Sequence, residues 1–110
     1  QWDMMLQTPI VTESSARFVA EQFIHSCPTF VFDGIPETLE FAETLRPGAA
    51  DAWVFVYRFD SRQAGYGDRT GQMLAQVITP HEAHITVQNN VVVSAVMDEK
   101  WDMLAQKMLP

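Results

Sequence analysis

One glycine-rich loop holds the residues whose types and spacing could do chemistry. Residues 65–71 read Gly-Tyr-Gly-Asp-Arg-Thr-Gly and contain three of the five glycines. The loop lacks the Gly-Lys-Ser/Thr ending of a phosphate loop, and its glycine spacing differs from the dinucleotide-binding pattern. Three interpretations stay open: a hairpin connection in which Asp68 pairs with Arg69 or caps backbone amides, a recognition surface, and a metal or anion loop.

A recognition surface is the interpretation that would give this loop a function. Arginine guanidinium groups suit carboxylate or phosphate ligands, and three arginines occur between residues 58 and 69 of an acidic chain. Asp60 and Asp68 are nearby carboxylates that could satisfy them instead. The candidate binding residues are Arg62, Tyr66, Asp68, Arg69, Thr70 and Gln72. If they form a contact surface, replacing Tyr66 and Arg69 is expected to leave the fold intact.

A pair of histidines offers the one metal-binding hypothesis. His81 and His84 are three residues apart, which would place them on one face of a helix but on opposite faces of a strand. The residues that follow favour a strand, and solvated histidines at a sheet edge are the alternative. Asp68 could complete a site only if the loop folds back onto them.

Other reactive residues do not combine into a catalytic group. His25 and Cys27 are two residues apart and would not face each other on a helix, where Cys27 falls on the apolar stripe. The carboxylates are scattered, so no acid–base pair can be named. The sequence therefore predicts no catalytic residue and no cofactor.

The composition of the chain argues against several classes of protein. The 110 residues fit one domain, and 47% of them are hydrophobic, which is enough for a core without disulfides. A net charge of −7 disfavours binding to nucleic acid or to anionic membrane surfaces. No apolar run approaches the roughly 20 residues of a spanning helix. A single cysteine leaves the redox compartment open.

Periodicity predicts the elements that must position the loop. Thr12 is a plausible N-cap for a helix whose apolar stripe ends at Cys27, because Pro28 terminates it. Alternating aromatic residues predict a central strand from Trp53 to Asp60, paired with a strand at 38–46. Residues 72–79 look strand-like up to Pro80, which is expected at a bulge or sheet edge. Asn89-Asn90 predicts a tight hairpin, and 101–108 is expected to be a turn or helix.

These elements predict an α+β domain with one helix on a four-stranded antiparallel sheet. The residues expected to face the helix are Phe41, Trp53, Phe55, Tyr57, Val87, Val93 and Met97. Residues 12–110 form this domain in the prediction, and 1–11 form an N-terminal tail.

The N-terminal tail contains a short motif that occurs again near the C-terminal end of the chain. Trp2, Asp3, Met4 and Gln7 match Trp101, Asp102, Met103 and Gln106 at a constant offset of 99 (101 − 2). The hypothesis is that the tail ends a preceding copy in a tandem array. Coincidence is the alternative.

The element order over residues 12–98 resembles the cystatin-like and PepSY-type small domains. The loop at 66–72 and Trp101-Asp102 also look similar to an uncharacterised group of prokaryotic, often exported proteins. The chain lacks the Gln-x-Val-x-Gly hairpin and the Pro-Trp with which cystatins enter a protease cleft. The resemblance to PepSY-type domains implies an interaction role and an extracellular or cell-envelope location.

The functional expectation is a non-enzymatic module that binds a protein or peptide, with self-association as a further expectation. The alternative is a small-ligand or metal-binding domain that uses residues 65–72 with His81 and His84.

Overall fold

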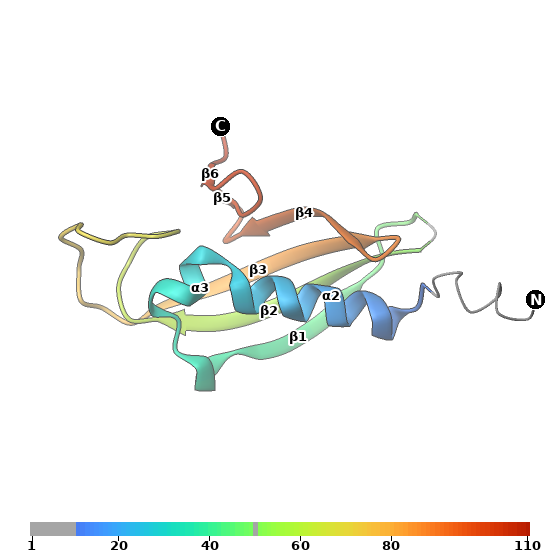
Figure 1. Cartoon of the computed structure of the whole chain (residues 1–110), viewed down its shortest axis with the longest axis horizontal. Helices are drawn as coiled ribbons and strands as arrows, with labels where there is room; N and C mark the ends of the chain where they lie inside the picture. Colours follow the sequence, from blue (N-terminus) through green and yellow to red (C-terminus); the bar gives the residue numbers. More distant parts are fainter. Residues whose placement is uncertain (1–10, 50) are drawn as a thin grey trace, which may run out of the picture.

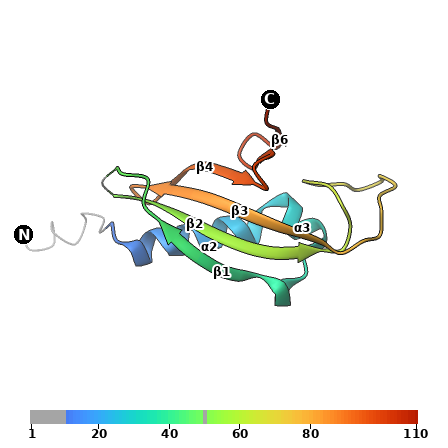
Figure 2. The same cartoon turned by 180° about the vertical axis from the view of Figure 1, so that it is seen from behind.

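A computed structural model describes residues 11–49 and 51–110, and Gln1–Gln7 lie outside the described part. Helices cover one face of an antiparallel sheet, and the other face stays open, as the two opposite views show (Figures 1 and 2). The α+β class is therefore confirmed. The sheet has six strands in the described chain, however, so the prediction of four was wrong.

Helix α2 (Glu13–Ser26) begins and ends where the sequence predicts. Thr12 Oγ1 accepts from the Ser15 amide, and Ser15 Oγ accepts from the Thr12 amide, so the two residues form a capping box. Cys27 ends the helix in an extended conformation because Pro28 follows it. The stripe residues Ala16, Ala20 and Ile24 are fully buried.

A second helix was not anticipated. Helix α3 (Pro28–Asp33) begins at the proline that terminates α2, since proline suits the first turn of a helix. A short 3-10 helix, η1 (Pro36–Thr38), then leads into the sheet. Helix α3 brings Thr29 and Asp33 toward the glycine-rich loop, which decides the structure of the loop.

The strands follow one another across the sheet in chain order, each antiparallel to the next. Their bounds are β1 Glu40–Leu45, β2 Ala52–Ser61, β3 Thr79–Gln88, β4 Val91–Met97, β5 Trp101–Asp102 and β6 Lys107–Met108. The β3–β4 hairpin turns at Asn89 and Asn90, both at positive φ, as predicted. The expectation of a turn or helix at 101–108 missed the β5–β6 pair, which closes through Gln106 at φ +57°.

The segment from Gln72 to Ile78 was expected to be a strand and is not one. Only Thr79 belongs to β3, in which Pro80 pairs with Asp60 of β2. On its other side β3 meets β4 only from Ala83 onward, so Pro80 lies where the strand has a single neighbour. Pro80 therefore lies at a local edge of the sheet, as expected for a proline.

The aromatic face of β2 forms the core. Trp53, Phe55, Tyr57 and Phe59 are all buried in a cluster with the α2 stripe. Burial, helped by a hydrogen bond to Glu21, raises the pKa of Tyr57 to about 12. Val93 was expected in this face but is 50% exposed, because a register shift at Thr86/Val87 places Val92 opposite Val87.

Neither described helix has the length and apolar character that crossing a bilayer requires.

Truncating the centre of this core should be costly. Phe55 has no exposed surface, so Phe55→Ala should lower the free energy of unfolding by roughly 3–5 kcal/mol through the cavity it leaves. Denaturant melts of the two proteins measure the difference. A loss below about 1 kcal/mol would show that this ring does not pack as described.

Candidate functional site

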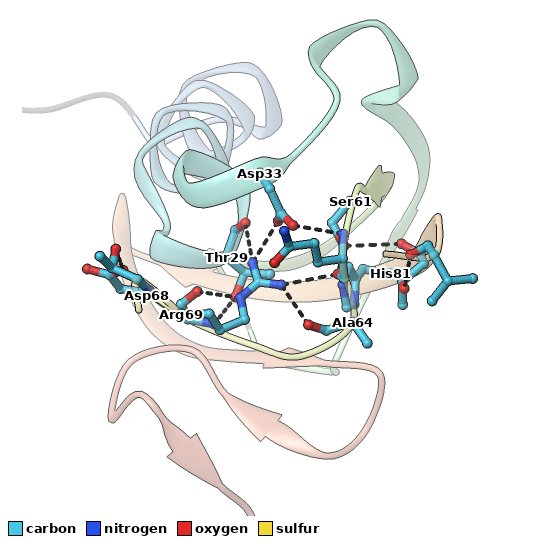
Figure 3. A network of polar contacts seen from close by, with 12 residues as sticks. Thr29, Asp33, Ser61, Ala64, Asp68, Arg69 and His81 are labelled. Carbon is cyan, nitrogen blue, oxygen red and sulfur yellow. Dashed lines mark hydrogen bonds and ion pairs between the residues drawn. The ribbon is translucent and has the colours of Figure 1, made fainter. Parts of the chain in front are cut away.

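Arg69 lies at the centre of the long connection between β2 and β3, which spans residues 62–78 (Figure 3). Its side chain is only 2% exposed and forms an ion pair of 2.7 Å with Asp33, itself 9% exposed. The guanidinium carbon also lies 4.7 Å from the centre of the Phe32 ring. Arg69 was a candidate for binding a partner, with pairing to Asp60 or Asp68 as the alternative. Its guanidinium instead points inward and pairs with Asp33.

All five N–H groups of this guanidinium have acceptors. Nε donates to the Gly67 carbonyl (2.9 Å), and Nη1 donates to the carbonyls of Gln63 (3.2 Å) and Ala64 (3.1 Å). Nη2 donates to the Thr29 carbonyl (3.2 Å) and to Asp33 Oδ1. A buried charge is tolerated when it is paired and every donor is satisfied, which is the case here.

Helix α3 completes this arrangement from the other side. Thr29 Oγ1 accepts from the Gly67 amide (2.7 Å), and Asp33 Oδ2 accepts from the Gln63 amide (2.8 Å). The Asp33 carbonyl accepts from the Arg62 amide (3.1 Å). Residues 62–69 are therefore fixed to α3 by both backbone and side-chain bonds, and we call this set of contacts the Arg69 clamp.

Two of the loop glycines lie where a side chain would crowd a neighbouring residue. A side chain on Gly65, at φ +104°, would come within 2.8 Å of Arg69 Cδ. A side chain on Gly67, at φ +73°, would come within 3.3 Å of the Trp101 ring. The glycine spacing therefore reflects close packing and positive φ angles rather than phosphate binding.

Asp68 and Thr70 face away from the clamp and are exposed. Asp68 Oδ1 accepts from both the amide and the hydroxyl of Thr70, and these bonds lower the pKa of Asp68. Asp68 thus caps a backbone amide, one of the predicted alternatives, while Arg69 pairs with Asp33. Among the remaining candidates, Arg62 and Gln72 are exposed and Tyr66 is half-buried.

A second polar cluster lies beneath the loop and was missed in the sequence. The Ser61 hydroxyl lies 3.1 Å from His81 Nε2, and His81 Nδ1 lies 2.7 Å from Asp98 Oδ2. A serine, a histidine and a carboxylate linked in this order have the connectivity of a nucleophilic triad. Ser61 is fully buried, however, and its hydroxyl donates to the Gln63 carbonyl (2.8 Å). No substrate can approach it in this arrangement, so the cluster ties β2 to β3.

Asp98 joins the loop to this cluster. Its carboxylate accepts from the Tyr66 hydroxyl (3.0 Å) and from the Glu82 amide (2.7 Å) as well as from His81. Burial alone would raise the pKa of Asp98, but the hydrogen bonds outweigh burial and lower it. Burial and the bond to Asp98 raise the pKa of Tyr66 to about 12.

The structure does not bring the predicted metal ligands together. His81 is buried, so describing it as a solvated edge histidine was wrong, and its ring is bonded to Ser61 and Asp98. His84 points to the opposite face of β3, where it lies 3.1 Å from Glu82. Asp68 lies across the Arg69 clamp from His81 (Figure 3). In the residues described, no group of three or more ligating side chains is placed to hold a metal ion.

Two surface features adjoin the clamp. A hollow of about 490 Å³ lies beside the clamp and is lined by Ser26, Pro28, Val31, Phe32, Asp68 and Thr70. Beyond it, residues 71–78 extend from the end of the sheet (Figure 1). This segment exposes Met73 almost completely, together with Val77 and Ile78.

Cys27 is buried, which raises the pKa of its thiol, and it contributes nothing to either surface.

Comparison with protein-family models, with curated proteins and with solved structures finds no match for this chain. The resemblance to cystatin-like and PepSY-type domains therefore stays a prediction.

Removing the guanidinium should destabilise the protein. Arg69→Ala leaves Asp33 buried without its counter-charge, which should cost roughly 3–5 kcal/mol of unfolding free energy. Arg62→Ala is the matched control, since Arg62 is exposed, and should stay within about 0.5 kcal/mol of wild type. Urea melts compare them. Equal stability of the two variants would contradict the clamp.

The Asp98 contacts should make stability depend on pH. The folded-state pKa of Asp98 lies below its unfolded value, which is near 4, so its contribution is complete above that value. The contribution is lost as pH falls through the folded-state pKa. The difference in unfolding free energy between wild type and Asp98→Asn should therefore shrink as pH falls from about 5 to 2. A constant difference across that range would be evidence against these contacts.

Proposed function

We propose that this chain is a non-enzymatic module that binds a protein or peptide through residues 70–78. The observation that carries the proposal is the exposed apolar segment of the loop. Met73 is 99% exposed, Val77 54% and Ile78 56%, all within six residues. Apolar side chains gathered on an exposed loop are typical of contact surfaces.

The loop is held at both ends, which favours binding. The Arg69 clamp fixes the chain before the segment, and β3 fixes it afterwards from Thr79. A segment with anchored ends loses less conformational entropy on binding than a free chain does. Buried Arg69 and half-buried Tyr66 thus support the surface, while Asp68, Thr70 and Gln72 border it.

The backbone of the segment is available for pairing. In the part of the chain that the structure describes, residues 73–78 make one bond to another backbone segment, from the Ala64 amide to the Ala75 carbonyl (3.3 Å). Their composition is strand-like, but none of the strands in the described part of the chain pairs with them. A partner peptide that adds an extended strand here would bring its side chains beside Met73 and Val77 on one face and beside Ile78 on the other.

The proposal includes export and a tandem arrangement, on the strength of the resemblance and the repeat at 2–7 and 101–106. A small-ligand site is the second candidate, and the hollow beside Asp68 and Thr70 is the observation that favours it. Its volume falls in the range of small-molecule sites. Its walls would offer the carboxylate of Asp68 and the hydroxyls of Ser26 and Thr70 to a ligand.

A displayed random-peptide library tests the interaction role. Peptides selected on the wild-type chain should lose binding, by tenfold or more, to the variant Met73→Ser/Val77→Thr/Ile78→Thr, because the apolar contacts are removed. The matched control is Phe18→Ser/Val91→Thr/Val93→Thr, which changes three exposed apolar residues elsewhere. Both variants should keep wild-type thermal stability within about 1 kcal/mol.

Peptides that bind the loop variant as tightly as wild type would place the contact surface elsewhere. Peptides that lose binding only to the variants Asp68→Ala or Thr70→Ala would favour the hollow as the binding site instead.

A further inference from the structure

The residues of the repeated motif at 101–106 have identifiable contacts. Trp101 stacks on Tyr66, with ring centres 5.4 Å apart and planes 10° from parallel. Met103 is buried, and its amide donates to the Ala95 carbonyl (2.8 Å). We call the surface that receives them, formed by Tyr66, Gly67, Ala95 and Met97, the Tyr66 slot.

Asp102 and Gln106 shape the turn that presents these two anchors. Asp102 Oδ1 accepts from the amides of Leu104 and Ala105 (3.0 Å each). The Gln106 amide donates to the Asp102 carbonyl (2.8 Å), and its side chain donates to the Met103 carbonyl (2.6 Å). Leu104 and Ala105 are exposed.

The match at the N-terminus follows this division of roles. Trp2, Asp3, Met4 and Gln7 are identical to the four residues that make the contacts. Met5 and Leu6 differ from Leu104 and Ala105, which are the two exposed positions. Identity that coincides with the contacting positions indicates a second copy of the same docking motif rather than a chance match.

We infer that the Tyr66 slot of one copy of this chain accepts residues 2–7 of a second copy when its own residues 101–106 are released. The contacts in the slot define its occupant. It must offer an indole that stacks on Tyr66 and a methionine side chain two residues later, as Trp101 and Met103 do. This interaction does not rest on the proposed peptide-binding role, since it uses the slot and not residues 70–78; it shares with the proposed tandem arrangement only the repeat at 2–7 and 101–106.

Residues 101–106 compete for the slot with residues 2–7 of a second copy. Residues 101–106 follow β4 after only Asp98, Glu99 and Lys100, so their effective concentration at the slot is high, on the order of millimolar. The resident motif therefore prevails at micromolar protein. Its indole N–H is buried and meets no acceptor among the described residues, which makes its release less costly.

Emptying the slot tests the inference. In Trp101→Ala the resident motif loses its stack, so the Trp2 motif of a second copy should dock instead. Sedimentation at about 100 µM protein, with a reductant because Cys27 is free, should show dimers or larger species. Trp2→Ala/Trp101→Ala should be monomeric, as should wild type at low micromolar concentration. A monomeric Trp101→Ala, or equal association of the two variants, would overturn the inference.

A peptide provides the second arm in case Trp101→Ala does not fold alone. A synthetic peptide of residues 1–9 at about 1 mM should restore the near-ultraviolet circular dichroism of Trp101→Ala. The same peptide with Trp2→Ala should bind at least tenfold more weakly. In the folded protein, the peptide should shift the amide resonances of Gly67 and Ala95. Equal behaviour of the two peptides would overturn the inference.

Discussion

The buried ion pair between Arg69 and Asp33 is the interaction on which the connection between β2 and β3 depends. It joins a helix to a loop 36 residues later, and it satisfies every donor of the guanidinium. Removal of either partner would leave a charge without compensation in the interior, which costs several kcal/mol. The loop therefore adopts the one conformation in which Arg69 reaches Thr29, Asp33 and three carbonyls of its own segment.

This constraint divides the connection between β2 and β3 into two parts with different roles. Residues 62–69 belong structurally to α3, whereas residues 71–78 carry exposed apolar side chains and little backbone bonding. The Ser61–His81–Asp98 cluster reinforces the first part from below, since Tyr66 bonds to the same carboxylate as His81. The proposed peptide-binding role would use this arrangement, in which a hydrogen-bonded base presents an exposed segment.

The predictions succeeded where the physical signal is local. The capping residue Thr12, the apolar stripe of α2, the alternation in β2 and the Asn89-Asn90 turn all act through neighbours in sequence. Helix α3 was not predicted, because a proline such as Pro28 is compatible both with the end of one helix and with the first turn of the next. The burial of Arg69 could not be inferred, because its counter-charge lies on that unrecognised helix.

Arg69 and Tyr66, two of the six loop residues that the sequence assigned to binding, illustrate the same limit. Arginine and tyrosine are common in contact surfaces, and nothing adjacent to Tyr66 reveals that Trp101 and Asp98 will surround it. In the described part of the chain, β5 and β6 join the sheet through tight turns at Asp98, Glu99 and Gln106. These residues have positive φ angles, which residues other than glycine rarely adopt, so their sequence did not indicate the turns. Val93 moved outward because a bulge shifts the alternation by one residue.

Amide hydrogen exchange measured by NMR tests the division of the loop most directly. The amides of Gln63 and Gly67 donate to Asp33 and Thr29, so they should exchange far more slowly than the amides of residues 73–78. Protection of the first two and rapid exchange of the segment is the result that this account predicts. Comparable rates throughout residues 62–78 would contradict it, because the Arg69 clamp would then not hold the loop.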